Sequence, residues 1–300
     1  MRKSGRRSFL KQGFLGLTAC GATGLSLSAA REPSPFETEM GPTREPRKFK
    51  LGLVTYDLAK DWDIDTIIKN CKATGFEGVE LRTTHRHGVE PTIGKARRAE
   101  VRKRFEDSGV RLVSLGSTCE FESPDPAEVN RNIQLTRQFC ELARDVGAMG
   151  VKVRPNGFPP GVSQAKTLEQ IGHALSKCGD IAHDNGVEIW LEVHGKGTEL
   201  PDNIHRIMTV ADHSAVGICW NSNPTDVVGG SVRQSFALLG RWLRSCHINE
   251  LWNEYPWGEL FVLFRSAGYS RYTFAEIQGS CEPIRLMHYY RALWKYEAAA

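Results

Sequence analysis

The stretch GVEIWLEVHG, residues 186–195, joins an apolar run to an acid and a histidine. The run is short and rich in β-branched and aromatic residues, which is typical of a buried strand. Glu192 and His194 stand at its far end, and residues two apart on a strand point to the same face. The stretch therefore predicts a buried strand that brings a carboxylate and an imidazole to one place just beyond its end.

The same unit, a short apolar strand followed by a helical stretch, recurs eight times. The strands are predicted at residues 50–56, 76–82, 110–117, 151–154, 187–193, 216–221, 243–249 and 272–278. Several strands are preceded by a glycine, which most easily forms a left-handed helix cap; these are Gly75, Gly109, Gly150, Gly186 and Gly268.

This alternation predicts an α/β fold, because strands that alternate with helices form a parallel sheet with right-handed crossovers. Eight units predict a closed (β/α)₈ TIM barrel, a single domain over residues 49–297. An open, doubly wound sheet is the alternative. It would need a glycine-rich phosphate turn after its first strand, and VTYDLAKDW at residues 54–62 has none.

The N-terminus has the features of an export signal. RRSFLK at residues 6–11 precedes an apolar stretch of small residues that runs to Ala30, a pattern that predicts a twin-arginine signal peptide over residues 1–30 and a periplasmic location. The tetrapeptide that ends at Cys20 resembles a lipobox, so lipidation at Cys20 stays open beside cleavage near Ala30. Residues 31–48 are charged and rich in proline, which predicts a linker.

Composition narrows the class of protein. Lysine and arginine number 39 against 35 acidic residues, and part of this excess lies in the first eleven residues, so the rest of the chain is close to neutral. This disfavours a nucleic-acid binder, which normally has a concentrated basic face. No apolar run is long enough to span a bilayer.

The eight cysteines include no CxxC pair, and twin-arginine export carries chains already folded in a reducing cytosol, so we expect free thiols. The sequence has no clear signature of oligomeric state.

Paired polar residues follow six of the predicted strands. They are Glu80 and Arg82, Lys152 and Arg154, Glu192 and His194, Asn221 and Asn223, His247 and Asn249, and Glu276 and Gln278. Barrel enzymes carry their chemistry at this carboxyl end of the strands. Carboxylates, an imidazole and amide oxygens that converge there suit a divalent cation such as Mn²⁺, Mg²⁺, Co²⁺ or Zn²⁺, which would also relieve the repulsion between the acids.

The strand ends LEVH, VGICWN, CHIN and FAEIQ resemble the xylose isomerase-like TIM barrel family, which includes sugar phosphate isomerases, epimerases and related endonucleases. The resemblance covers about residues 48–295 and implies a metal held by four residues, Glu192, Asn221, His247 and Glu276. Many members have an aspartate, with a histidine three residues later, where this chain has Asn221 and Pro224. A neutral amide lowers the charge of the ligands, so metal affinity should weaken unless Asp226 compensates.

The resemblance implies a metal-dependent sugar isomerase or epimerase. Glu192 and Glu276 are expected to act as acid and base on the two faces of a cis-enediolate. The other polar residues of the mouth, and two tryptophans predicted to lie in a loop, are expected to bind the sugar; these are Glu80, Arg82, His85, His87, Lys152, Arg154, His194, Asn223, Asn249, Trp252 and Trp257. Because phosphorylated sugars are mostly cytoplasmic, export favours an unphosphorylated sugar or sugar derivative.

Two alternatives use the same residues. A leaving group beta to the carbonyl would turn proton removal into elimination, which makes the chain a keto-sugar lyase or dehydratase. A non-catalytic sugar-binding barrel is the second alternative, and Asn221 would then be a sign of a disabled metal site. The endonuclease branch is disfavoured, because it needs a fuller set of acid and histidine ligands and a basic surface.

Overall fold

The structure, a computed structural model, describes residues 48–299, and these contain a closed barrel of parallel strands in chain order. Each strand pairs with the next, and the last pairs with the first. The strands are β1 Lys50–Val54, β2 Gly78–Arg82, β3 Arg111–Glu120, β4 Gly150–Arg154, β5 Glu188–Glu192, β6 Val216–Trp220, β7 Leu243–Ile248 and β8 Tyr272–Ala275. The predicted (β/α)₈ barrel is confirmed, whereas the predicted signal peptide lies outside the described residues, as does nearly all of the predicted linker.

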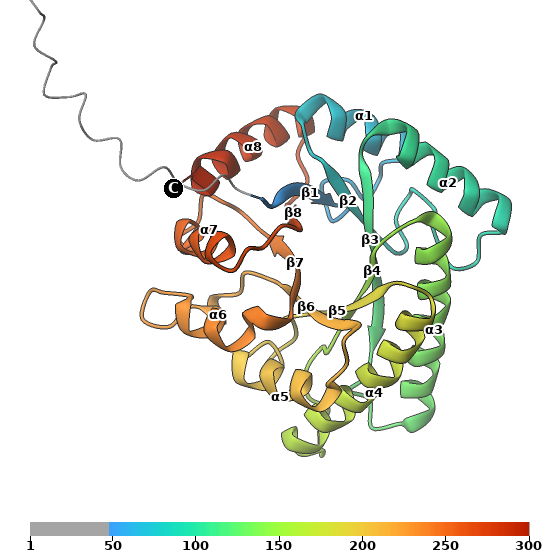
Figure 1. The fold of residues 1–300 in the computed structure, drawn as a ribbon, viewed down its shortest axis with the longest axis vertical. Helices are drawn as coiled ribbons and strands as arrows, with labels where there is room; N and C mark the ends of the chain where they lie inside the picture. The colour runs from blue at the N-terminus through green and yellow to red at the C-terminus, as the bar shows by residue number, and fades with distance from the viewer. Residues whose placement is uncertain (1–47, 300) are drawn as a thin grey trace, which may run out of the picture. The chain divides into compact units, whose positions relative to one another are not determined.

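The helices follow the strands around the outside of the ring (Figure 1). They are α1 Ile64–Thr74, α2 Lys95–Ser108, α3 Pro126–Val146, α4 Gln164–Asp184, α5 Pro201–Ala211, α6 Arg233–Leu239, α7 Trp257–Ser266 and α8 Pro283–Ala299, with 3₁₀ turns η1 Pro224–Asp226 and η2 Gly240–Trp242. No helix within residues 48–299 is both long and apolar enough to cross a membrane.

Glycine caps end several helices as expected, with one correction. Gly75 and Gly109 adopt left-handed backbone angles, with φ of 74° and 77°. Gly150 does not cap a helix, since it is the first residue of β4; the left-handed cap of α3 is Gly147, with φ of 77°. The sequence GAMG, residues 147–150, has a glycine at each end. Spacing alone does not tell which of the two caps the helix, because both stand just before the predicted strand.

Large side chains fill the inside of the barrel. Trp190, Tyr272 and Phe274 belong to one buried cluster, and the rings of Tyr272 and Phe274 stack with centroids 5.8 Å apart. Glycines on neighbouring strands make the room for these rings: a Cβ atom on Gly150 would lie 2.5 Å from the ring of Trp190. The interior below the mouth is therefore a packed aromatic layer.

The cysteines of the described residues are all free. Six of them are buried in strands and helices, and Cys281 is exposed. Burial raises the pKa of thiols such as Cys71 to about 12, so these groups stay protonated and behave as small apolar side chains.

Gly150→Ala should destabilise the barrel by about 1–3 kcal/mol, because the new methyl group would overlap the Trp190 ring. The ring cannot easily move, since its Nε1 donates to Glu188 Oε2 at 2.7 Å. Urea denaturation of both proteins measures the difference. Gly279→Ala is the control, because its Cβ would meet only ordinary contacts, 3.6 Å or more away, and equal losses in the two variants would contradict the aromatic-layer argument.

Candidate active site

The carboxyl ends of β5, β7 and β8 bring an imidazole and two carboxylates together. His247 Nδ1 lies 3.4 Å from Glu192 Oε1 and 3.4 Å from Glu276 Oε2. One ligand atom from each of these three residues lies within 4.8 Å of the other two. Alternation along the strands explains the convergence, because Glu192 and Glu276 are each two residues beyond a ring of the aromatic layer, Trp190 and Phe274, and share its face.

The donors of this cluster fit a divalent cation. His247 Nδ1 is buried and has no hydrogen-bond partner, although it faces two carboxylate oxygens. Ligand atoms about 2.1 Å from a metal and separated by roughly 90–110° lie about 3.0–3.4 Å from one another. The two separations between His247 and the carboxylates, 3.4 Å each, lie at the upper end of this range. The mixed oxygen and nitrogen donors suit first-row transition metals as well as harder ions.

Each carboxylate of this cluster has its second oxygen directed to a positively charged side chain. Lys152 Nζ lies 2.5 Å from Glu192 Oε2, and both side chains are buried. Arg82 Nη1 lies 4.0 Å from Glu276 Oε1, in a more open position. The two acids therefore differ: Glu192 is enclosed and directly bonded, while the side chain of Glu276 keeps 16% of its surface exposed.

The charges of this cluster support one another. Burial alone would raise the pKa of Glu192, but Lys152 and His247 outweigh burial and hold that pKa well below its usual value. Burial likewise would lower the pKa of Lys152, yet the carboxylates around it, beginning with Glu192, raise that pKa. Burial would lower the pKa of His247, but Cys219, Glu276 and Glu80 outweigh burial and raise that pKa. The lysine and Glu192 are thus a buried ion pair at neutral pH.

The loop after β6 carries Asn221 and is tightly tied to its neighbours. Ser222 adopts a left-handed conformation, with φ of 51°, and donates through Oγ to His247 O at 2.8 Å. Asn223 Nδ2 donates to Val193 O at 2.6 Å, and Asn249 Nδ2 donates to Ser222 O at 3.4 Å. Both of these amide nitrogens are therefore engaged with backbone at the mouth.

Asp226 does not supply the carboxylate that Asn221 lacks. It lies in η1, almost fully buried, and its Oδ2 accepts hydrogen bonds from Asn223 N at 2.8 Å and from the Tyr255 hydroxyl at 3.1 Å. Tyr255 in turn accepts from Trp220 Nε1 at 2.9 Å. Burial raises the pKa of Asp226 to about 7. Its role is to fix the loop.

Three residues predicted to bind substrate are placed elsewhere. Glu80 is fully buried behind His247. His87 is buried, with Nε2 donating to Arg82 O and Nδ1 accepting from Val89 N, so its ring fixes its own loop. Trp257 begins helix α7 instead of lying in a loop, and only 3% of it is exposed.

The remaining predicted residues lie around the mouth. Arg154 pairs with Glu120, the last residue of β3, which the sequence analysis missed because the predicted strand ended at residue 117. His85 Nδ1 lies 3.2 Å from Thr55 Oγ1, and His194 Nδ1 is buried without a partner. Trp252 is 76% exposed.

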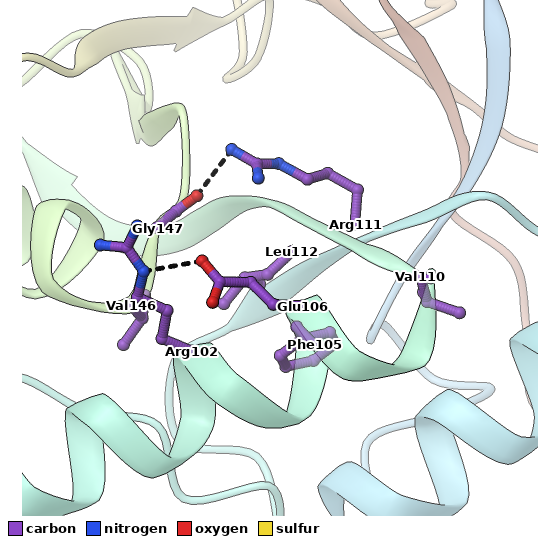
Figure 2. Close-up of a pocket in the computed structure, with 9 residues that line it drawn as sticks. Arg102, Phe105, Glu106, Val110, Arg111, Leu112, Val146 and Gly147 are labelled. Carbon is purple, nitrogen blue, oxygen red and sulfur yellow. Dashed lines mark hydrogen bonds and ion pairs between the residues drawn. The ribbon is translucent and has the colours of Figure 1, made fainter.

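A separate cavity of about 280 Å³ lies between helix α2 and the start of β3, at the opposite end of the strands (Figure 2). Its guanidinium groups are engaged, Arg102 with Glu106 and Arg111 with Gly147 O, each at 2.8 Å. None of the predicted site residues lines it.

The chain is thus a closed (β/α)₈ barrel with a cluster of two acids and an imidazole at the carboxyl end of its strands. The family model for xylose isomerase-like TIM barrels matches residues 68–280, and the chain belongs to this family. Comparison with curated protein sequences finds no match.

Several solved structures share the fold. D-psicose 3-epimerase from Clostridium cellulolyticum H10, solved with D-tagatose, has a TM-score of 0.72 at 13% identity and covers 83% of this chain and 99% of its own. The 3-keto-D-glucoside 4-epimerase YcjR from E. coli scores 0.69 at 15% identity, covering 84% and 100%. The IOLI protein, solved with a zinc atom, scores 0.69 at 16% identity, covering 84% and 97%. At sequence identities this low, the TM-scores demonstrate a shared fold and nothing more.

Asp226→Asn should remove a pH-dependent loss of stability. The folded-state pKa near 7 lies above the usual 3.8, so the folded protein keeps a proton that the unfolded chain releases between about pH 4 and pH 7. The free energy of unfolding of the parent should therefore fall as pH rises through this window, by roughly 4 kcal/mol in total, and then level off. Urea denaturation across pH 4–8.5 measures the slope. Asp184→Asn, at an exposed position, should keep the parental slope, and an unchanged slope in Asp226→Asn would refute the assignment.

Asn221→Asp should strengthen metal binding by about tenfold or more, because it adds a charged ligand at the position where many members of the family have an aspartate. Titration with Mn²⁺, Co²⁺ and Zn²⁺, followed by calorimetry, gives the affinities. Gln278→Glu is the matched control, since it adds the same charge at an exposed position of the mouth. Equal gains in both variants would mean that Asn221 is not a ligand.

Proposed function

We propose that this chain is a metal-dependent isomerase or epimerase that acts on an unphosphorylated sugar or sugar derivative. The observation that carries the proposal is the position of His247 Nδ1, buried and equally distant from the oxygens of Glu192 and Glu276 at the barrel mouth. The sugars named for structures of the same fold, at low identity, support the choice of substrate class.

Glu192, His247 and Glu276, joined by Asn221, would hold the cation. When bound, a divalent cation polarises a sugar carbonyl and makes the proton on the adjacent carbon acidic. The identity of the metal is left to experiment among Mn²⁺, Mg²⁺, Co²⁺ and Zn²⁺.

Proton transfer falls to the carboxylates. Glu276 is the more exposed acid, and its Oε1 is not within hydrogen-bonding distance of Arg82, so it is free to accept the proton of the substrate. Glu192, on the other side of His247, is ionised, so the proton that it returns to the opposite face of a cis-enediolate would first pass to it from the Lys152 ammonium. Exchange with water would then remove the proton from Glu276 and restore the one on Lys152. Lys152, bonded to Glu192 Oε2, would stabilise negative charge that develops on the substrate oxygens.

The substrate is proposed to carry no phosphate because the cations of the mouth are already neutralised. Lys152 pairs with Glu192, Arg154 pairs with Glu120, and Arg82 lies beside Glu276. The twin-arginine motif at residues 6–11 supports the same choice, since it favours a periplasmic protein. His85, His194 and the exposed Trp252 remain for hydroxyl groups and for a sugar ring.

A keto-sugar lyase is the second candidate, and one observation favours it. Lys152 occupies one oxygen of Glu192, whereas Glu276 is open, so the two acids are unequal. Elimination needs one base, whose captured proton can pass to the leaving β-oxygen, while epimerisation needs a base on one face and a proton donor on the other. Product analysis distinguishes the two reactions.

The direct test is turnover of keto-sugars by metal-loaded protein. Stoichiometric metal and conversion of a ketohexose or a 3-keto-glucoside are expected, and Glu276→Gln should lower kcat by about 10²–10⁴-fold because it removes the base. Elemental mass spectrometry and NMR of the products provide the measurements. Glu106→Gln, at an exposed acid that lines the cavity at the opposite end of the strands, is the control. Tight sugar binding without turnover in metal-replete protein would instead identify a binding protein.

A further inference from the structure

Glu80 is the most enclosed acid near the site. It has no exposed surface, and its Oε1 lies 3.1 Å from His247 Nε2, on the side of the ring opposite Nδ1. Its Oε2 accepts a hydrogen bond from Ser114 Oγ at 2.8 Å. Both oxygens of Glu80 are thus engaged with protein, and no surface is left for a sugar.

The local structure of β2 and β3 makes this arrangement. The register between the strands shifts between Val79 and Glu80, which sets Ser114 opposite Glu80. At Gly116 a Cβ atom would lie 3.0 Å from Glu80 Oε1, so glycine leaves room for the carboxylate. A buried carboxylate with two fixed hydrogen bonds has little freedom to rotate.

Glu80 has the surroundings of an accepting carboxylate. Ser114 Oγ donates to its Oε2, and His247 Nε2 faces its Oε1 at 3.1 Å. An ionised carboxylate can only accept a hydrogen bond, so the proton of this contact belongs to His247 Nε2. Nδ1, which faces Glu192 and Glu276, is then the ring nitrogen that a metal would bind by displacing its proton.

We propose that Glu80 is a positioning residue that holds the His247 ring with its proton on Nε2, so that Nδ1 faces the metal position between Glu192 and Glu276. A histidine ligand usually donates its second N–H to a carboxylate or carbonyl, which fixes the ring and makes it a stronger ligand. The negative charge of Glu80 also compensates for the charge that Asn221 does not supply, although Glu80 would act through His247 and would not contact the metal. This inference rests on the metal site of the proposed function, though not on its substrate.

Metal titration tests this role. Glu80→Gln keeps the shape of the side chain and removes its charge, and we expect Co²⁺ to bind 10–100-fold more weakly, with a changed visible absorption spectrum. Ser114→Ala leaves Glu80 charged but less restrained, so a smaller loss of affinity in the same direction is expected; it also keeps the test valid if Glu80→Gln does not fold. Co²⁺ affinity and spectrum equal to those of the parent in Glu80→Gln would overturn the proposal.

Glu188→Gln is the matched control, because Glu188 lies in the same barrel at the amino end of β5, where it binds Arg271 and Trp190. Its Co²⁺ affinity should equal that of the parent, and a loss as large as that of Glu80→Gln would mean that removing any interior acid weakens the site, which overturns the proposal. Nitrogen-15 NMR of the histidines in metal-free protein, assigned with His247→Gln, should show a proton on Nε2 of His247. A parent that binds no metal refutes the proposed function, whereas an unprotonated Nε2 refutes the role of Glu80.

Discussion

Three carboxylates, from β2, β5 and β8, converge on the single imidazole of His247, and the site depends on how their repulsion is balanced. Lys152 meets the charge of Glu192 directly, and His247 donates to Glu80. The third acid has only a guanidinium 4.0 Å away. A cation among the three ligand atoms would complete this balance, since opposite charge favours the ionised acids. The positions of Lys152, His247 and Arg82 beside the three acids follow from this need to balance charge.

The loop after β6 shows how the chain accommodates an amide at a position where many members of the family have an acid. Its geometry is set by hydrogen bonds that do not involve a metal: Ser222 holds the backbone of β7, and Asp226 holds the loop through Tyr255. Asn221 is thus placed by protein contacts. A side chain that is already held in place loses less conformational entropy when it binds a cation. This gain would offset part of the affinity that is lost when a neutral amide replaces a charged carboxylate.

The repeat of strand and helix predicted the barrel. The places of Glu192, His247 and Glu276 at the carboxyl ends of predicted strands, together with the family resemblance, predicted that these three residues meet. The two-residue alternation along a strand predicts the face on which a side chain lies. It does not predict how deeply the side chain is buried or which residue it contacts. Glu80 shares the inward face and yet lies behind His247, because a register shift and Gly116 open room for it. Trp257 was misplaced since the helical periodicity of α7 begins at that residue, immediately after Pro256.

The aromatic layer of Trp190, Tyr272 and Phe274 closes the barrel immediately below the site. The His247 ring rests edge-on against Phe274, with centroids 6.3 Å apart. This packed layer therefore blocks approach to the site through the barrel interior. A sugar, and any proton that exchanges with water, must approach from the mouth, so the loops around the mouth, and not the barrel, set how well the site is shielded from water.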